Sequence, residues 1–254
     1  MHPYVQAVLD SSPQNYWPYG SDGDPLAGAS VITTHGATFG VPGPLLHGDL
    51  GATSFDGGAN FAQVPLDLST LGLFTVELFL LWDTSGTDDD FLMEQSATAN
   101  SNPGFNFDWN ASGGVSLKIN WGAGEARWVF ARPTDDVFHH LMAVIAANGT
   151  IVPEVFIDGA AVVVTEGDAP SQNSGTFTAD TLNLMCRDGS ALFGAGDMAH
   201  LAFYPADVSA DLPAHIAAIT AEEEPEPPEP GKFKDARLGW GLTPGNYMIN
   251  KGAL

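Results

Sequence analysis

The chain has few basic residues and almost no cysteine. Its 254 residues carry eight Lys and Arg against 31 Asp and Glu, a formal net charge of −23. Because this charge repels phosphate groups, we expect neither nucleic acid nor an anionic membrane as a partner. The single cysteine, Cys186, excludes an internal disulfide and fits synthesis in a reducing cytoplasm.

Long apolar segments are also missing. No stretch approaches the roughly 20 apolar residues that cross a bilayer, and Met1–Tyr4 lacks the basic and apolar regions of a secretory signal. We therefore expect synthesis in the cytoplasm without a signal peptide. Action outside a cell would then require lysis or assembly into a particle.

Short apolar or alternating runs, closed by Gly, Pro, Asn or Asp, make up most of the sequence. Their short spacing predicts an all-β fold, a two-sheet antiparallel sandwich. Eleven such runs are present: 60–64, 73–82, 91–95, 105–109, 115–121, 126–131, 138–147, 151–158, 160–165, 181–185 and 198–204.

Three features of this pattern make specific predictions. Residues 105–109 and 115–121 alternate strictly around 110–114, which predicts a hairpin with one face in the core. Residues 73–82 and 141–147 are apolar at nearly every position and predict interior strands. The one helical pattern is a short closing helix through Ile219, capped by Ser209 or Asp211.

Several of these runs together resemble a laminin-G-like, or concanavalin-A-like jelly-roll, domain of the kind found in bacteriophage tail and adhesion proteins. The resemblance covers about residues 4–220 and implies a jelly-roll sandwich. Phe138 stands where the family usually has tryptophan, and Pro153 indicates an edge or a bulge. The motifs, in order, are 4–9 with 12–17, the Phe-Asp-Gly turn in 54–65, the buried strand 74–79, Phe138-His139-His140 in 138–144, the Asp-Gly hairpin in 155–159, and 197–204 followed by Val208, Ser209 and His215.

Charge and composition divide the chain into three parts. Residues 1–220 form the expected sandwich, and residues 221–231 form a Glu/Pro-rich linker. Counting charges, residues 1–230 hold four bases against thirty acids, or −26, whereas the arm at 232–254 holds four bases against one acid, or +3. Large apolar side chains spaced by glycine predict that this arm anchors on another protein subunit. A disordered tail is the alternative. The expected anchors are Phe233, Arg237, Leu238, Trp240, Tyr247, Met248 and Ile249.

The sequence offers no convincing catalytic set, and we expect no enzyme. Glycosidases of this fold class need paired carboxylates on one strand face, and the nearest approach, Glu166-Gly167-Asp168, lies in an expected loop. His139 and His140 are adjacent on a strand, so they should point to opposite faces. No nucleophile elbow of the Gly-x-Ser-x-Gly kind follows a strand.

Two kinds of ligand remain open. Asp83–Asp90 is the densest cluster of oxygen ligands, so calcium is the one cofactor to test against a plain solvated turn. Trp109, Trp121 and Trp128 lie near strand ends and are candidates to stack on a sugar ring, with core filling as the alternative.

We therefore predict a non-enzymatic structural protein of a bacteriophage virion: a minor tail, fibre or capsid-decoration subunit in a multimeric assembly. Its sandwich would bind host-surface glycan or cover the shell, and residues 232–254 would attach it to other virion proteins. The alternatives are a free carbohydrate-binding module and a glycan-degrading hydrolase.

Overall fold

The structure is a computed structural model that describes residues 1–19, 23–45, 50–83, 91–95, 104–110, 114–121, 124–134, 136–168, 177 and 179–221. The chain divides into two units, Met1–Glu223 and Glu224–Leu254. All of the described residues belong to the first unit. The predicted arm, with its seven anchor residues, therefore lies outside the described residues.

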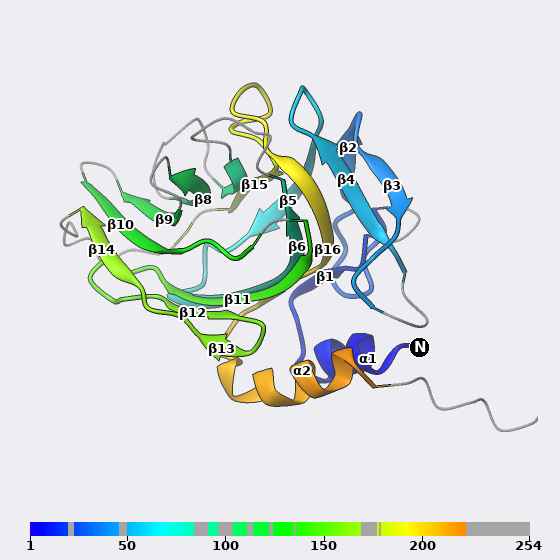
Figure 1. The fold of residues 1–254 in the computed structure, drawn as a ribbon. Coiled ribbons are helices and arrows are strands. Elements are labelled where there is room, and N and C mark those ends of the chain that lie inside the picture. Colours follow the sequence, from blue (N-terminus) through cyan, green and yellow to red (C-terminus); the bar gives the residue numbers. More distant parts are fainter. Residues whose placement is uncertain are drawn as a thin grey trace, which may run out of the picture. The chain divides into compact units, whose positions relative to one another are not determined.

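The first unit is a sandwich of two eight-stranded antiparallel sheets, which confirms the predicted fold class (Figure 1). Sheet A runs β13 (Ala160–Ala161), β12 (Glu154–Ile157), β11 (Phe138–Ala146), β6 (Leu73–Trp82), β16 (Ala195–Tyr204), β4 (Ala52–Asp56), β3 (Thr38–Val41), with β1 (Asn15–Trp17) paired to β16. Sheet B runs β14 (Thr165–Asp168), β10 (Gly124–Ala131), β9 (Gly114–Trp121), β8 (Gly104–Asn110), β7 (Phe91–Gln95), β15 (Ala179–Leu184), β5 (Phe61–Asp67), β2 (Thr33–His35).

The strongest strand predictions are confirmed. β6 and β11 are neighbours inside sheet A and are buried along almost their whole length. β8 and β9 form the predicted hairpin. The turn between β12 and β13 uses Asp158 and Gly159 at φ +51° and +79°, the left-handed values that a tight hairpin requires.

Two hydrophobic cores hold the unit together. The larger lies between the sheets and includes Phe74, Phe105 and Leu182. The smaller lies on the other face of sheet A, under helices α1 (Pro3–Asp10) and α2 (Leu212–Ile219). Figure 1 shows both helices together on the side of sheet A that faces away from sheet B.

Helix α1 was not predicted, since only one stretch of the sequence looks helical. It begins because His2 Nδ1 accepts a hydrogen bond from the backbone N–H of Tyr4, and because proline fits the first helical position. Tyr4, Val5 and Val8 are then buried against sheet A. Tertiary packing stabilises this eight-residue helix, which would be too short to persist alone.

Three further expectations need correction. The closing helix forms, but the Asp211 side chain does not cap it and instead accepts a hydrogen bond from Ser11. Residues Glu166-Gly167-Asp168 lie in strand β14 rather than in a loop. Strands β1 to β4 lie in segments for which no strand was predicted. Within the described residues, no helix is long and apolar enough to cross a membrane.

Candidate functional site

A row of polar residues crosses the outer face of sheet B, the face directed away from sheet A. Each member is the Cα partner of the next across neighbouring strands, and the register continues to Asp168 on β14. The residues that alternate with them, such as Phe107 and Leu117, lie in the core between the sheets. This polar row consists of Thr33, Gln63, Asn183, Glu94, Asn106, Lys118 and Arg127.

The polar row is exposed at its β2 end and buried at its centre. Thr33 is exposed and Gln63 half-buried, whereas Asn183, Glu94 and Asn106 are at most 2% exposed. Since buried polar groups require partners, the row is cross-linked: Gln63 Nε2 donates to Asn183 Oδ1 at 2.7 Å.

The neighbouring positions on this face are also polar. Lys118 Nζ lies 2.6 Å from Asp108 Oδ2, and Arg127 Nε donates to Ser116 Oγ at 3.0 Å. Burial raises the pKa of the Asp108 carboxyl, and the ion pair with Lys118 offsets this only in part. The face therefore presents carboxylates, amides and cations side by side.

Aromatic rings lie beside the exposed end of the polar row. His35 and Phe61 stack with ring centroids 4.2 Å apart, and Phe193 lies 6.0 Å from Phe61. Phe61 and Phe193 are half-buried and His35 is exposed. Phe61 precedes Gln63 by two residues on β5, so both side chains point to the same face. We call His35, Phe61 and Phe193 the aromatic ledge.

The loop between β15 and β16 covers part of this face. The backbone N–H of Asp188 donates to Glu94 Oε2 at 3.0 Å. Gly189 has φ +63°, and a Cβ at this position would lie 2.9 Å from Gln63 Nε2. The loop thus fits closely over Glu94, Gln63 and Phe61, and it carries Phe193 of the aromatic ledge.

A second polar cluster surrounds Glu77 on the other side of the molecule, between sheet A and the helices. The carboxylate accepts hydrogen bonds from Tyr4 Oη at 2.9 Å, Tyr204 Oη at 2.6 Å, His140 Nε2 at 2.6 Å and His215 Nδ1 at 2.9 Å. Burial alone would raise the pKa of Glu77, but the hydrogen bonds and charges of the two histidines outweigh it and hold that pKa far below its ordinary value.

Ser11, His215 and Glu77 are in line, as in a serine hydrolase, but this arrangement does not suit a nucleophile. The Ser11 hydroxyl donates to Asp211 Oδ2 at 2.9 Å, so His215 Nε2, also 2.9 Å away, donates to Ser11. Burial lowers the pKa of His215, but the hydrogen bond and charge of Glu77 outweigh burial, and the net increase in pKa favours a charged ring. Glu77 and His215 are at most 1% exposed. The cluster fastens α1 and α2 to sheet A.

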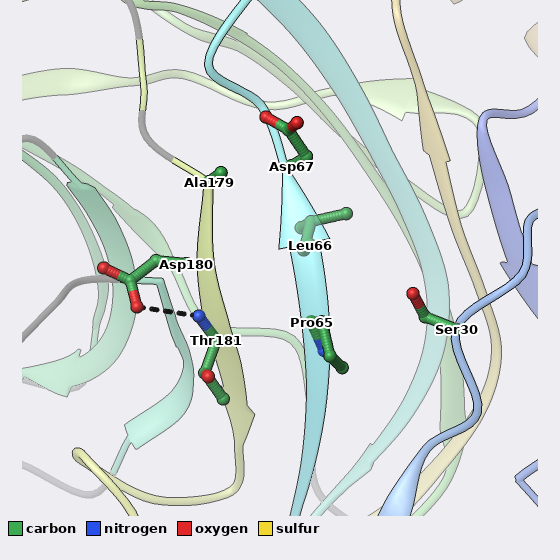
Figure 2. Close-up of a pocket in the computed structure, with 7 residues that line it drawn as sticks. All are labelled: Ser30, Pro65, Leu66, Asp67, Ala179, Asp180 and Thr181. Atoms are coloured by element: carbon green, nitrogen blue, oxygen red, sulfur yellow. Dashed lines mark hydrogen bonds between the residues drawn. The ribbon is translucent and has the colours of Figure 1, made fainter.

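A shallow hollow of about 400 Å³ lies across β5 and β15, near Ser30 (Figure 2). It contains two carboxylates, and both have local partners: Asp67 Oδ1 accepts from Ser69, and Asp180 Oδ1 accepts from the N–H of Thr181. Figure 2 shows the two carboxylates on neighbouring strands without converging on one point. The hollow therefore lacks the ligand set of a metal site.

Of the three sugar-stacking residues proposed from the sequence, the structure describes the side chain of Trp128. Trp128 is 4% exposed and belongs to the core between the sheets, so the alternative of core filling holds for it. Trp109 is the penultimate residue of β8 and Trp121 the last residue of β9, and their side chains lie outside the described residues. The aromatic ledge, which the sequence reasoning missed, offers one exposed ring, His35, and two half-buried rings, Phe61 and Phe193.

The other candidates are placed as follows. His140 is buried against Glu77, whereas His139 is partly exposed and bonded to Asp158, so the two do point to opposite faces. Of the possible calcium segment only Asp83 is described. Across the described ranges, no group of three or more His, Cys, Asp or Glu is placed to hold a metal ion.

The family model for the concanavalin A-like lectin/glucanases superfamily matches residues 56–211, which include most of both sheets. The chain belongs to this superfamily. A comparison with curated proteins found no match.

Solved structures share the fold at low sequence identity. The binding domain of botulinum neurotoxin DC in complex with SialylT superposes with a TM-score of 0.61 at 8% identity, over 84% of this chain and 52% of that one. Botulinum neurotoxin type C, whose cell entry depends on interaction with two ganglioside molecules, gives 0.62 at 8% over 85% and 53%. Trypanosoma rangeli sialidase gives 0.58 at 11% over 82% and 33%. The chain thus spans about half of the neurotoxin chains and a third of the sialidase.

Proposed function

We propose that the protein is a non-enzymatic adhesion subunit of a bacteriophage particle, and that it binds host-surface glycan on the outer face of sheet B. The observation that carries the proposal is the polar row ending at the aromatic ledge. Amide and carboxylate groups match sugar hydroxyls as donors and acceptors, and aromatic rings take up the apolar face of a sugar ring.

The exposed end of the row is where a glycan would bind first. Thr33 and Gln63 are accessible there, beside His35 and Phe61. The buried centre, from Asn183 to Asn106, would hold these groups in place rather than touch ligand. Membership of the lectin/glucanase superfamily supports this choice of ligand, as do neighbours that were solved with SialylT or depend on gangliosides.

The virion role is supported by composition and by the resemblance to phage proteins. A body of charge −26 precedes an arm of charge +3 that is rich in aromatic residues. Such an arm suits attachment to other virion proteins, so that the sandwich is displayed outward.

Glycan-array binding by purified residues 1–223 tests the adhesion role. We expect binding to at least one surface glycan, and about a tenfold loss of affinity for Phe61→Ala, the size of one lost stacking contact. The matched control is Phe138→Ala, which removes a half-buried phenylalanine from sheet A. Equal binding by Phe61→Ala and wild type, or no binding to any glycan, would refute the adhesion role.

Truncation before Glu222 tests the virion role separately. We expect the truncated protein to fold, because all of the described cores lie within residues 1–221. It should be missing from purified particles that incorporate the full chain. Normal incorporation would contradict anchoring by the arm. A full chain that binds glycan but is not incorporated into particles would favour a free carbohydrate-binding module.

One observation favours a hydrolase as the second candidate. Glu94 and Asp108 are buried carboxyls on neighbouring strands of the same face, offset by two residues in the register. Such diagonal neighbours are about 7–8 Å apart, close to the separation used by inverting glycosidases. Release of reducing ends from bacterial polysaccharide, abolished by Glu94→Gln, would establish the hydrolase and overturn the non-enzymatic proposal.

A further inference from the structure

An apolar groove of about 340 Å³ lies at the edge of sheet A that ends in β13. It is lined by residues 152–156, 161, 162 and 164. Val152 in this lining is 51% exposed, and Ile151 and Val163, which directly precede lining residues in the sequence, are exposed by 51% and 80%. Single exposed valines are common, but a group of them around a groove marks an interaction surface.

The backbone at this edge does not suit pairing with an added strand. β13 has only two residues, and the N–H of Val162 already donates to the carbonyl of Val155 at 2.9 Å. Pro153, in the groove wall, has no N–H to donate. A partner would therefore bind this groove through side chains that enter it.

Charge indicates which partner this is. The described lining contains the exposed carboxylate of Glu154 and no basic residue. A second sandwich is opposed by repulsion, because residues 1–230 carry −26. Residues 232–254 carry the opposite sign, +3, and space Phe, Trp, Tyr, Met and Ile side chains with glycines.

We propose that the groove binds residues 232–254 of a second copy of this chain. The inference rests on the anchoring role of the arm in the proposed function and names a partner for it. The spacer of residues 222–231 contains four prolines in ten residues, and such a sequence spans about 30 Å at about 3.1 Å per residue. A proline-rich spacer is extended and stiff, which favours a groove on a neighbouring copy over the groove of the same chain.

This arrangement joins copies head to tail. Each copy gives its arm to one neighbour and receives an arm from another, so the contact is heterologous and produces either a closed ring or an open filament. Side-chain entry into the groove requires no strand in the arm, which agrees with the glycines at 239, 241, 245 and 252.

Two measurements test the proposal. A labelled peptide of residues 232–254 is titrated with the sandwich, residues 1–223, and followed by fluorescence anisotropy. The full chain is run by sedimentation velocity over a range of concentrations. We expect saturable peptide binding, and we expect the mass of the full chain to rise with concentration.

Val152→Lys is the groove variant. Because Val152 lines the groove and is 51% exposed, the change should not unfold the protein, but it places a positive charge against a basic peptide and should weaken binding by about tenfold or more. Val31→Lys, at a valine that is 52% exposed outside the groove, is the matched control and should bind the peptide as wild type does.

Three results would overturn the inference. If the peptide does not bind the sandwich, or binds Val152→Lys as well as wild type, the groove is not its binding site. A full chain that stays monomeric and does not accept added peptide, while the sandwich does, shows that the arm occupies its own groove. Loss of the truncated protein from particles together with no peptide binding would keep the anchoring role and place the arm on a different virion protein.

Discussion

Replacing Glu77 by glutamine should strongly destabilise the sandwich. The carboxylate is fully buried and accepts hydrogen bonds from four side chains: Tyr4, His140, Tyr204 and His215. A glutamine keeps one acceptor oxygen and turns an NH₂ group toward donors, so about two of the four bonds are lost. Each donor left buried without an acceptor costs about 1–3 kcal/mol, which agrees with about 3–5 kcal/mol for a broken buried ion pair.

The loss should be visible as a lower melting temperature. A domain of this size shifts by about 2–4 °C for each kcal/mol, so we expect Glu77→Gln to melt about 10 °C below wild type by circular dichroism at pH 6. Glu166→Gln is the matched control, because Glu166 is exposed on β14. If Glu77→Gln melts within about 2 °C of wild type, the fastening role of Glu77 is wrong.

The same cluster predicts how stability varies with pH. The pKa of Glu77 lies below its ordinary 4.5, so its contribution is present above about pH 4.5 and is lost as the pH falls further. The pKa of His215 is raised above 6.5, so its contribution is full below that pH and is lost as the pH rises through the raised pKa. Burial, followed by the charge of Glu77, raises the pKa of Tyr4 and of Tyr204, so neither phenol titrates in this range. The gap in melting temperature between wild type and Glu77→Gln should therefore be widest between about pH 4.5 and 6.5, and a gap that does not change with pH would contradict this account.

Three smaller changes test other parts of the fold. Gly196→Ala should cost at least about 1–3 kcal/mol in urea unfolding, because φ is +138° and a Cβ would collide with the carbonyl oxygen of Leu81; an unchanged midpoint would be inconsistent with that contact. Burial raises the pKa of the Cys186 thiol to about 12, so a thiol reagent at pH 8 should label it only as the protein unfolds, and rapid labelling of the native protein would disprove its burial. Ser11→Ala should cost only about 1 kcal/mol, because Ser11 is half-buried and links Asp211 to His215 by single hydrogen bonds; a loss as large as that of Glu77→Gln would show that Ser11, rather than the carboxylate, holds the cluster together.

The local sequence pattern was sufficient to predict the central strands, because their alternating or continuously apolar residues directly reflect which side chains are buried. The hairpin at 105–121 and the buried strands β6 and β11 are examples. The pattern was insufficient for β1, β2 and β3, which have only three or four residues. β1 pairs with β16, almost two hundred residues later, so its partner cannot be found from nearby residues.

The candidate site could not be predicted because it depends on register across seven strands. Each of these strands contributes one member to the polar row, from Thr33 to Arg127 in space, and no local spacing connects them. Two local signals were nevertheless present. Glu77 is the single acid in a strand that is apolar at most positions. Trp128 lies two residues from the buried Ala126 and from the buried Phe130, so its side chain points to the same face of β10 as theirs, opposite to Arg127.

The location of helix α2 has a mechanical consequence. The helix lies on one broad side of the sandwich, the polar row on the other, and the polypeptide leaves α2 at Ile219. A force that pulls on the chain beyond Ile219 therefore acts on the helix side of the sandwich. The opposite face, which carries the polar row, still points toward the bound ligand. The contact between His215 and Glu77 would be among the first to carry that tension.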